Sequence, residues 1–302
     1  MKINKLKFTN DGFFYFRSFL NDKKCSKLLR AIYKNRNFRN IFLSEKKFYK
    51  NYKNNKSKTG LNPGPGRNLL HKLDCNFIFE NEKFKKIMKL VLGDRYRILD
   101  YKLVMGMPQS KIPKWIIKRT HNYHSVNLAE YINKKFRDLT YFKGIDFHQD
   151  IIDFPDRDPD FVTAYIYLDE VNENTSPLYL IPKSHQLGAD TFPHNLKFNN
   201  SKVYYKVKRN KIISKTKLLS GKSGTLSIWH PFMLHGTKPH EFDKPRISVR
   251  ILATKNRKSF IGCLLDQINN KIKGKKILKI RRSDLNEKGK VTKKNNIINK
   301  SL

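Results

Sequence analysis

The chain has 302 residues, with 64 Lys and Arg against 25 Asp and Glu, so its formal net charge at pH 7 is +39 and its pI is about 10.1. A chain of this length can bury a sizeable core, and a single β-rich domain of that size is ordinary, so length alone does not require several domains. Three separated cysteines, Cys25, Cys75 and Cys263, argue against a disulfide framework or a cysteine zinc site and fit a reducing cytoplasm, and the sequence shows neither an export signal nor a transmembrane run of about eighteen apolar residues.

The first third of the chain predicts two helices, with a short strand before them and strands after them. Asn21 and Asp22 can cap a helix over residues 23–35, and residues 81–92 carry apolar side chains at helical spacing and end at Gly93. Further elements are expected as a short strand at residues 3–9, a polar loop at 44–68 and strands at 95–107.

Residues 109–140 predict an insertion, with a helix near 127–137 and with Trp115, Tyr123 and Tyr131 in polar surroundings. This segment serves either as a substrate lid or as a peripheral decoration, and the sequence does not decide between them.

The second half predicts the strands of a barrel and then a basic tail. In residues 161–168, Thr163, Tyr165 and Tyr167 alternate with apolar residues, which is typical of a strand with one face toward a core or cavity. We expect one domain over residues 1–266, and a polar, lysine-dense tail at 267–302 that forms a short helix and is otherwise disordered. The barrel strands are expected at 145–150, 161–168, 177–182, 202–208, 224–229, 234–237 and 246–253.

The excess positive charge has two explanations. Lys, Asn and Ile are abundant together, as expected when an A/T-rich genome biases codons, and the charge is then spread over the surface. A polyanionic partner is the other explanation, and residues 46–58 favour it because Phe48, Tyr49 and Tyr52 alternate with lysines as in a groove for single-stranded nucleic acid. No specific nucleic acid is predicted, but the charge would help an anionic substrate reach the site.

His148 and Asp150 stand at positions i and i+2, so on an extended strand their side chains point to the same side. His235 follows the apolar run that ends at Trp229 and could join them from a later strand. Two imidazoles and one carboxylate form the facial triad that holds ferrous iron and leaves positions open. This pattern predicts an oxygenase.

Arg246, Ser248 and Arg250 alternate with Ile247 and other apolar residues, which predicts a strand with a polar inward face. A buried guanidinium is costly unless a planar anion meets it, so the pattern implies a carboxylate ligand.

Other residues near the motif are weaker candidates. His230 precedes Pro231 and is expected to orient a ligand or bond to the backbone, and Asp146 and Asp153 lack the i+2 spacing to His148. His185 is expected to complete a turn. The remaining histidines outside the motif are expected in solvated loops, at His121, His124, His194 and His240.

At these residues the sequence resembles the phytanoyl-CoA dioxygenase family. The likeness lies in His148-Gln149-Asp150, residues 161–170, residues 177–185 and residues 224–246. It covers about residues 8–255, is strongest over 147–250 and is weak at the start of the chain. Members are iron(II)- and 2-oxoglutarate-dependent oxygenases on a double-stranded β-helix. The resemblance thus implies a mainly β fold, a jelly-roll or cupin-like core with flanking helices.

Carried over by position, the resemblance implies that His148, Asp150 and His235 bind iron and act in catalysis. Arg246, eleven residues after His235, would bind the distal carboxylate of 2-oxoglutarate, and Thr237 would add a hydrogen bond. Ser248 and Tyr165 complete the residues expected at the cosubstrate.

The chain departs from the family pattern at four places, none of them in the triad. They are Gly106-Met107-Pro108 in place of a lysine-proline-proline turn, Tyr165 in place of tryptophan, Ser176 in place of glycine and Lys183 in place of glycine.

The resemblance implies a dioxygenase that uses dioxygen to hydroxylate a small organic, acyl or anionic substrate, in a cytoplasmic monomer or homodimer. Halogenation is not expected, because related halogenases have a small residue at the position of Asp150. Three alternatives stay open: a nucleic-acid demethylase with the same chemistry, a non-catalytic barrel that binds a ligand, and a basic binding protein.

Overall fold

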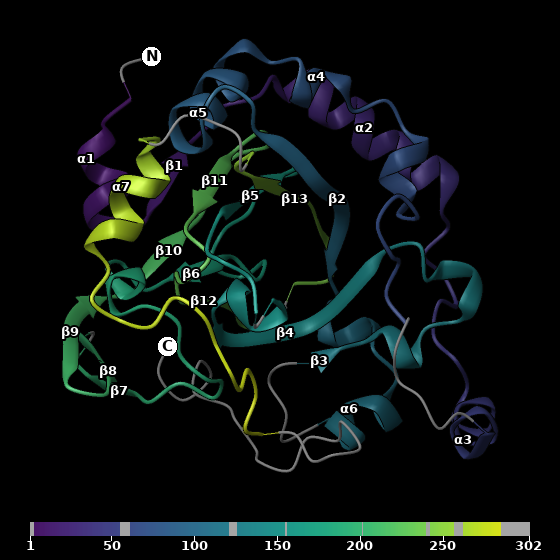
Figure 1. Ribbon diagram of the computed structural model, residues 1–302. Helices are drawn as coiled ribbons and strands as arrows, with labels where there is room; N and C mark the ends of the chain where they lie inside the picture. Colours follow the sequence, from purple (N-terminus) through teal and green to yellow (C-terminus); the bar gives the residue numbers. More distant parts are fainter. Residues whose placement is uncertain are drawn as a thin grey trace.

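The computed structural model is built around one large curved sheet with helices on its outside (Figure 1). It describes residues 3–54, 61–120, 126–154, 156–200, 202–239, 242–256 and 262–284. Three of the histidines expected in loops, His121, His124 and His240, lie outside the described residues, as do Tyr123 and the end of the predicted tail from residue 285.

The large sheet has the strand order β1-β11-β5-β13-β2-β4-β12-β6-β10, with β3 paired to β4. All its pairs are antiparallel except β2 with β4. Its strands are β1 (Phe13–Phe16), β2 (Arg97–Gly106), β3 (Val126–Asn127), β4 (Thr140–His148), β5 (Phe161–Tyr167), β6 (Leu178–Leu180), β10 (Lys217–Leu219), β11 (Leu226–Trp229), β12 (His235–Thr237) and β13 (Arg246–Thr254).

The two ends of this sheet meet, so that the sheet is nearly closed. The hydroxyl of Tyr15 in β1 donates to the carbonyl of Ser220, directly after β10, and Tyr167 in β5 donates to the carbonyl of Leu219 over 2.9 Å. Figure 1 shows the strands curving around a common interior. The predicted mainly β fold, with a jelly-roll core and flanking helices, is confirmed.

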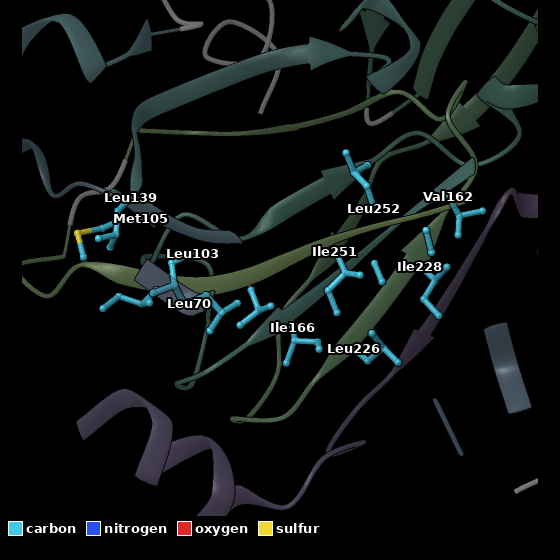
Figure 2. Close-up of a cluster of buried hydrophobic side chains, with 14 of the residues drawn as sticks. Leu70, Leu103, Met105, Leu139, Val162, Ile166, Leu226, Ile228, Ile251 and Leu252 are labelled. Carbon is cyan, nitrogen blue, oxygen red and sulfur yellow. The ribbon is translucent and has the colours of Figure 1, made fainter. Parts of the chain in front are cut away.

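The strands separate two kinds of side chain. Successive residues of a strand point to opposite faces, so Ile166 and Ile251 pack outward in a large apolar cluster while Tyr165 and Arg250 face the interior. Figure 2 shows part of the outward cluster, where Leu103 and Met105 of β2 join side chains of β5, β11 and β13. The polar inward face predicted for β13 is confirmed in this arrangement.

Helices cover the apolar outer face. The predicted caps form, because Asn21 accepts a hydrogen bond from the Lys24 amide and Asn81 accepts one from the Phe84 amide. The helices are α1 (Lys5–Asp11), α2 (Asp22–Asn35), α3 (Glu45–Asn54), α4 (Asn76–Phe79), α5 (Glu82–Leu92), α6 (Lys114–Thr120) and α7 (Leu264–Lys271), with short 3₁₀ turns at Leu69–Lys72, Gln109–Lys111, Ala129–Tyr131, Lys134–Phe136, Asp150–Asp153 and Ser184–Leu187.

The strand predicted at residues 3–9 is wrong, because this segment is α1. Gly12 adopts the left-handed conformation with φ of 85° and its amide closes the helix on the Phe8 carbonyl. Glycine takes this C-cap position at no steric cost, and the first strand begins immediately after it, at Phe13.

The polar loop predicted at residues 44–68 is wrong in its first part, where α3 forms. Phe48 of this helix is buried and stacks on Tyr131, with ring centroids 5.1 Å apart, and it also contacts Trp115. An aromatic core contact thus outweighed the polar composition. The helix expected near 127–137 is instead two separate 3₁₀ turns after β3.

A second, small antiparallel sheet contains β7 (Leu196–Asn199), β8 (Lys202–Val207) and β9 (Asn210–Lys215). Sequence patterning predicted β8 but neither of its neighbours. Residues 280–284 then run beside residues 191–193, where the Phe192 amide donates to the Arg281 carbonyl. No described helix is both long and apolar enough to cross a membrane. The division into a domain up to residue 266 and a tail stays a prediction.

Candidate metal centre

The structure brings His148, Asp150 and His235 together where β4 ends and β12 begins. His148 is the last residue of β4, and its register partner on β12 is His235. The two imidazole centroids are 4.2 Å apart, and Nε2 of His235 lies 3.8 Å from Oδ1 of Asp150. One potential ligand atom from each residue lies within 4.8 Å of the others.

The backbone between His148 and Asp150 explains why these two side chains face the same side. Gln149 is extended, with φ of −104° and ψ of 140°, and Asp150 opens a 3₁₀ turn immediately after it. The buried Gln149 side chain points away and donates to the carbonyls of Gly188 and Phe232, at 2.9 Å each. Its anchored amide therefore fixes the direction of both neighbours.

Both imidazoles present Nε2 to the cavity. Nδ1 of His148 lies 2.9 Å from the Asp146 carbonyl and Nδ1 of His235 lies 3.0 Å from the Met233 carbonyl, so each Nδ1 carries the proton that it donates. Burial, together with the His148 ring, lowers the pKa of His235 to about 3, and burial also lowers the pKa of His148. Neutral imidazoles with a free Nε2 lone pair are the form that binds metal.

Asp150 is buried and held by three donors. Its Oδ2 accepts from the Thr163 hydroxyl at 2.7 Å and from the Trp229 indole N–H at 2.8 Å, and its Oδ1 accepts from Arg250 at 2.6 Å. Burial alone would raise the pKa of Asp150, but the charge of Arg250, together with the hydrogen bond from Thr163, outweighs burial and holds the pKa well below its usual range. The carboxylate is thus ionised, with Oδ1 facing His235.

Arg246 lies beside the triad, at the start of β13. Its guanidinium donates to the Ser176 carbonyl and to the Tyr165 hydroxyl, while its buried Nε has no hydrogen-bond partner in the described residues. Gly106 stands opposite on β2, and a Cβ there would lie 3.6 Å from Nε, in ordinary contact. The guanidinium lines the cavity and forms no ion pair with a described carboxylate, so it suits an incoming one.

The expected site residues occupy one cavity of about 250 Å³, with one exception. The triad, Arg246, Thr237 and Tyr165 all line it. Ser248 lies on the same inward face of β13, but it does not line the cavity, and its buried hydroxyl has no partner in the described residues. The structure therefore gives Ser248 no contact with the cavity.

The rival ligands lie elsewhere or point elsewhere. His230 bonds to the Phe232 amide and to Asn269, as expected for a residue that orients its surroundings, and Asp146 caps the Phe147 amide. Asp153 lines the cavity without joining the cluster. His194 is not in a solvated loop as expected, because it is buried and lies 3.3 Å from Asp190.

Four residues of the site were missed as participants by sequence reasoning. They are the two donors to Oδ2 of Asp150, its ion-pair partner, and a cavity-lining lysine of β2: Thr163, Trp229, Arg250 and Lys102. Strand alternation did place Arg250 on the inward face. Its partner could be found only from the registers of β13 with β5 and β2 and of β2 with β4, since Arg250 and Asp150 are far apart in sequence.

The model of the family described as phytanoyl-CoA dioxygenase matches residues 8–248. The chain belongs to this family. The match spans most of the chain and includes the triad, Arg246, Thr237 and Tyr165, whereas Arg250 lies two residues beyond its end. Membership and the His-Asp-His donor set confirm the predicted cofactors, iron(II) and 2-oxoglutarate, and identify an enzyme of the non-heme, 2-oxoglutarate-dependent type.

No curated protein sequence matches the chain. Among solved structures, the apo form of the non-heme monooxygenase ThoJ is similar with a TM-score of 0.49 at 14% identity, over 84% of this chain and 77% of that one. The 2-oxoglutarate-dependent epimerase SnoN from nogalamycin biosynthesis has a TM-score of 0.48 at 12% identity, over 83% and 81%. EctD from S. alaskensis has a TM-score of 0.46 at 11% identity, over 83% and 75%. At these values the likeness is general, and the family rests on the sequence model.

Proposed function

We propose that the protein is a dioxygenase that hydroxylates a small-molecule substrate, with dioxygen and 2-oxoglutarate as co-reactants. The observation that carries this proposal is the convergence of two neutral imidazoles and one ionised carboxylate on one cavity, beside a guanidinium with an unpaired donor. A closed structural metal site would need a fourth protein ligand, and none of the described residues supplies one.

The residues of the cavity have separate roles in this proposal. His148, Asp150 and His235 hold the metal through Nε2, Oδ1 and Nε2, and Arg246 binds the distal carboxylate of 2-oxoglutarate with help from Thr237. The bound metal and cosubstrate supply the oxidising chemistry, in which 2-oxoglutarate and dioxygen become succinate and carbon dioxide and one oxygen atom enters a C–H bond of the substrate. Tyr165 bonds to Arg246 and orients it.

The donors behind Asp150 keep its geometry fixed. Thr163 and Trp229 both donate to Oδ2, so Oδ1 is left for the Arg250 hydrogen bond and for the metal. Cytoplasmic location and a monomeric or homodimeric state stay predictions that accompany this function. Phe48 packs in the core, so it cannot serve the nucleic-acid groove that residues 46–58 suggested.

The test is an anaerobic titration with ferrous iron and 2-oxoglutarate, followed by visible absorption and then by succinate release in air. We expect a visible charge-transfer band and succinate from the native chain, and neither from Asp150→Ala, because the carboxylate is one of three ligands. Asp153→Asn is the matched control, since Asp153 lines the same cavity outside the donor cluster. No band in the native chain, or a normal band in Asp150→Ala, would contradict the proposal.

A further inference from the structure

The strand pair β2–β13 carries two cationic positions on the wall of the cavity. The register places Arg246 opposite Gly106 and Arg250 opposite Lys102. Arg246, Arg250 and Lys102 all line the cavity. Four residues of extended chain separate the two arginines by about 13 Å at the backbone, so they are distinct binding positions.

Lys102 and Arg250 are like charges in directly opposite positions, an arrangement that destabilises a sheet when nothing neutralises it. Within the described chain, Lys102 has no ion pair, and the guanidinium of Arg250 donates only to Asp150. The other N–H groups of that planar fork have no protein acceptor among the described residues. Burial, with the neighbouring charge of Arg250, lowers the pKa of Lys102 to about 8.

The charges of the cavity do not balance without a further anion. Three cationic side chains, Lys102, Arg246 and Arg250, face two carboxylates, Asp150 and Asp153. A divalent metal and the dianion 2-oxoglutarate would add equal and opposite charges, so one positive charge would remain. Arg282 also reaches the cavity, but Asp284 already pairs with it over 2.6 Å.

We propose that Lys102 and Arg250 form an oxyanion site, and that the substrate is an anion whose carboxylate or phosphate binds there. This inference rests on the proposed function and names the substrate class for the same cavity. Arg250 contacts Asp150 through one amino group and presents its remaining fork to the cavity, so the anion would be held within reach of the metal ligands.

The test uses the full chain loaded anaerobically with ferrous iron and 2-oxoglutarate. Benzoate, phenyl phosphate and the neutral isostere benzamide are titrated by calorimetry while the visible band is recorded. We expect at least one of the two anions to bind about tenfold or more tightly than benzamide, and Lys102→Met to remove this preference, since a charge-assisted hydrogen bond is lost. The tighter of the two anions identifies the oxyanion.

Lys86→Met, on the exposed side of α5, is the matched control and should keep the preference. We also expect Lys102→Met to melt at a higher temperature than the native chain, because it removes a half-buried charge that forms no ion pair with any described residue. A lower melting temperature would give Lys102 a structural role and overturn the proposal.

Two further results would overturn the inference and leave the proposed function intact. One is equal binding of benzamide and both anions in a chain with a normal visible band. The other is displacement of 2-oxoglutarate by the anion, which would place the anion at Arg246. Absence of the band before any anion is added would instead contradict the proposed function itself.

Discussion

Asp150 shows how a single buried carboxylate can be kept both charged and available. Ionising a carboxylate away from water is costly, and the cost is offset here by one guanidinium, one hydroxyl and one indole N–H. Because the hydroxyl and the indole share Oδ2, they leave Oδ1 for a metal. Of these donors only Arg250 carries a charge, so Thr163 and Trp229 serve chiefly to orient the group.

Replacing Trp229 by Phe should therefore weaken metal binding with little change in the barrel. The variant keeps an aromatic ring in the wall and removes only the N–H that bonds to Oδ2. Loss of such a supporting hydrogen bond typically costs about 10–100-fold in metal affinity. The measurement is the dissociation constant of ferrous iron, determined anaerobically for the native chain and for Trp229→Phe.

Trp115→Phe is the control, because Trp115 packs on Phe48 and Tyr131 away from the cavity. It should bind iron as the native chain does. Equal dissociation constants for native protein and Trp229→Phe would show that Thr163 alone orients the carboxylate.

At this scale the sequence could predict which three side chains converge, but not the residues that hold them in place. His148 and Asp150 are two residues apart, so strand geometry alone placed them together. Arg246 came from the alternation of its strand and from the family resemblance, in which an arginine stands eleven residues after the second histidine. Thr163, Trp229 and Arg250 come from three different strands. Their meeting at Asp150 depends on the registers of β5, β11 and β13, which hydrophobic alternation does not specify across strands.

At the scale of elements, α1 is fastened to the 3₁₀ turn Ser184–Leu187 by a buried histidine. Nε2 of His185 lies 3.2 Å from the Thr9 carbonyl, and Nδ1 of His185 has no partner in the described residues. The backbone of Gly12 packs so closely on the His185 ring that a Cβ at Gly12 would clash with Nδ1. Only the neutral imidazole with a proton on Nε2 fits. Burial accordingly lowers the pKa of His185 to about 4.

This histidine should make the metal-free protein sensitive to acid. Its pKa in the folded state lies below that in the unfolded state, so the unfolded chain binds the proton more readily, and stability that is present above about pH 6.5 is lost as the pH falls toward about 4. By linkage the loss from this residue is about 2 kcal/mol at pH 5. Burial lowers the pKa of His230 as well, which adds to the loss.

Urea denaturation at pH 7.5 and pH 5.0 measures this effect in native protein and in His185→Gln. Glutamine can donate to the Thr9 carbonyl but cannot take up a proton, so the variant should lose less stability between the two values. The same loss in both proteins would mean that the acid sensitivity comes from other groups.

Element boundaries were predictable where capping and apolar periodicity agreed, as for α2 and α5. The predictions were wrong where a tertiary contact determines the local structure. Phe48 draws α3 onto the rings of Trp115 and Tyr131, a contact that the lysine-rich sequence around it does not suggest. The strands β7 and β9 were missed because both are short and three of their five exposed positions are lysines, which leaves little apolar alternation to recognise.

At the scale of the whole molecule, a formal charge of +39 coexists with a site whose cationic groups lie inside the barrel. The two kinds of charge should respond differently to salt. Exposed lysines attract any polyanion over distances comparable with the Debye length, about 10 Å at 0.1 M salt, and added ions screen that attraction. The buried guanidinium of Arg246 is shielded from those ions by the protein around it.

We therefore expect added salt to weaken any binding of DNA much more than the binding of 2-oxoglutarate. Raising sodium chloride from 50 to 200 mM should weaken binding of a 30-base-pair DNA duplex by about a thousandfold or more if six or more phosphates are contacted, whatever its sequence. The affinity for 2-oxoglutarate under the same conditions should change by less than about threefold, because ion pairs inside a cavity are screened far less. Electrophoretic mobility measures the DNA affinity, and anaerobic titration of the visible band measures the 2-oxoglutarate affinity.

DNA affinity that survived 200 mM salt, or that distinguished one sequence from another, would make nucleic acid a specific partner and would favour the demethylase alternative.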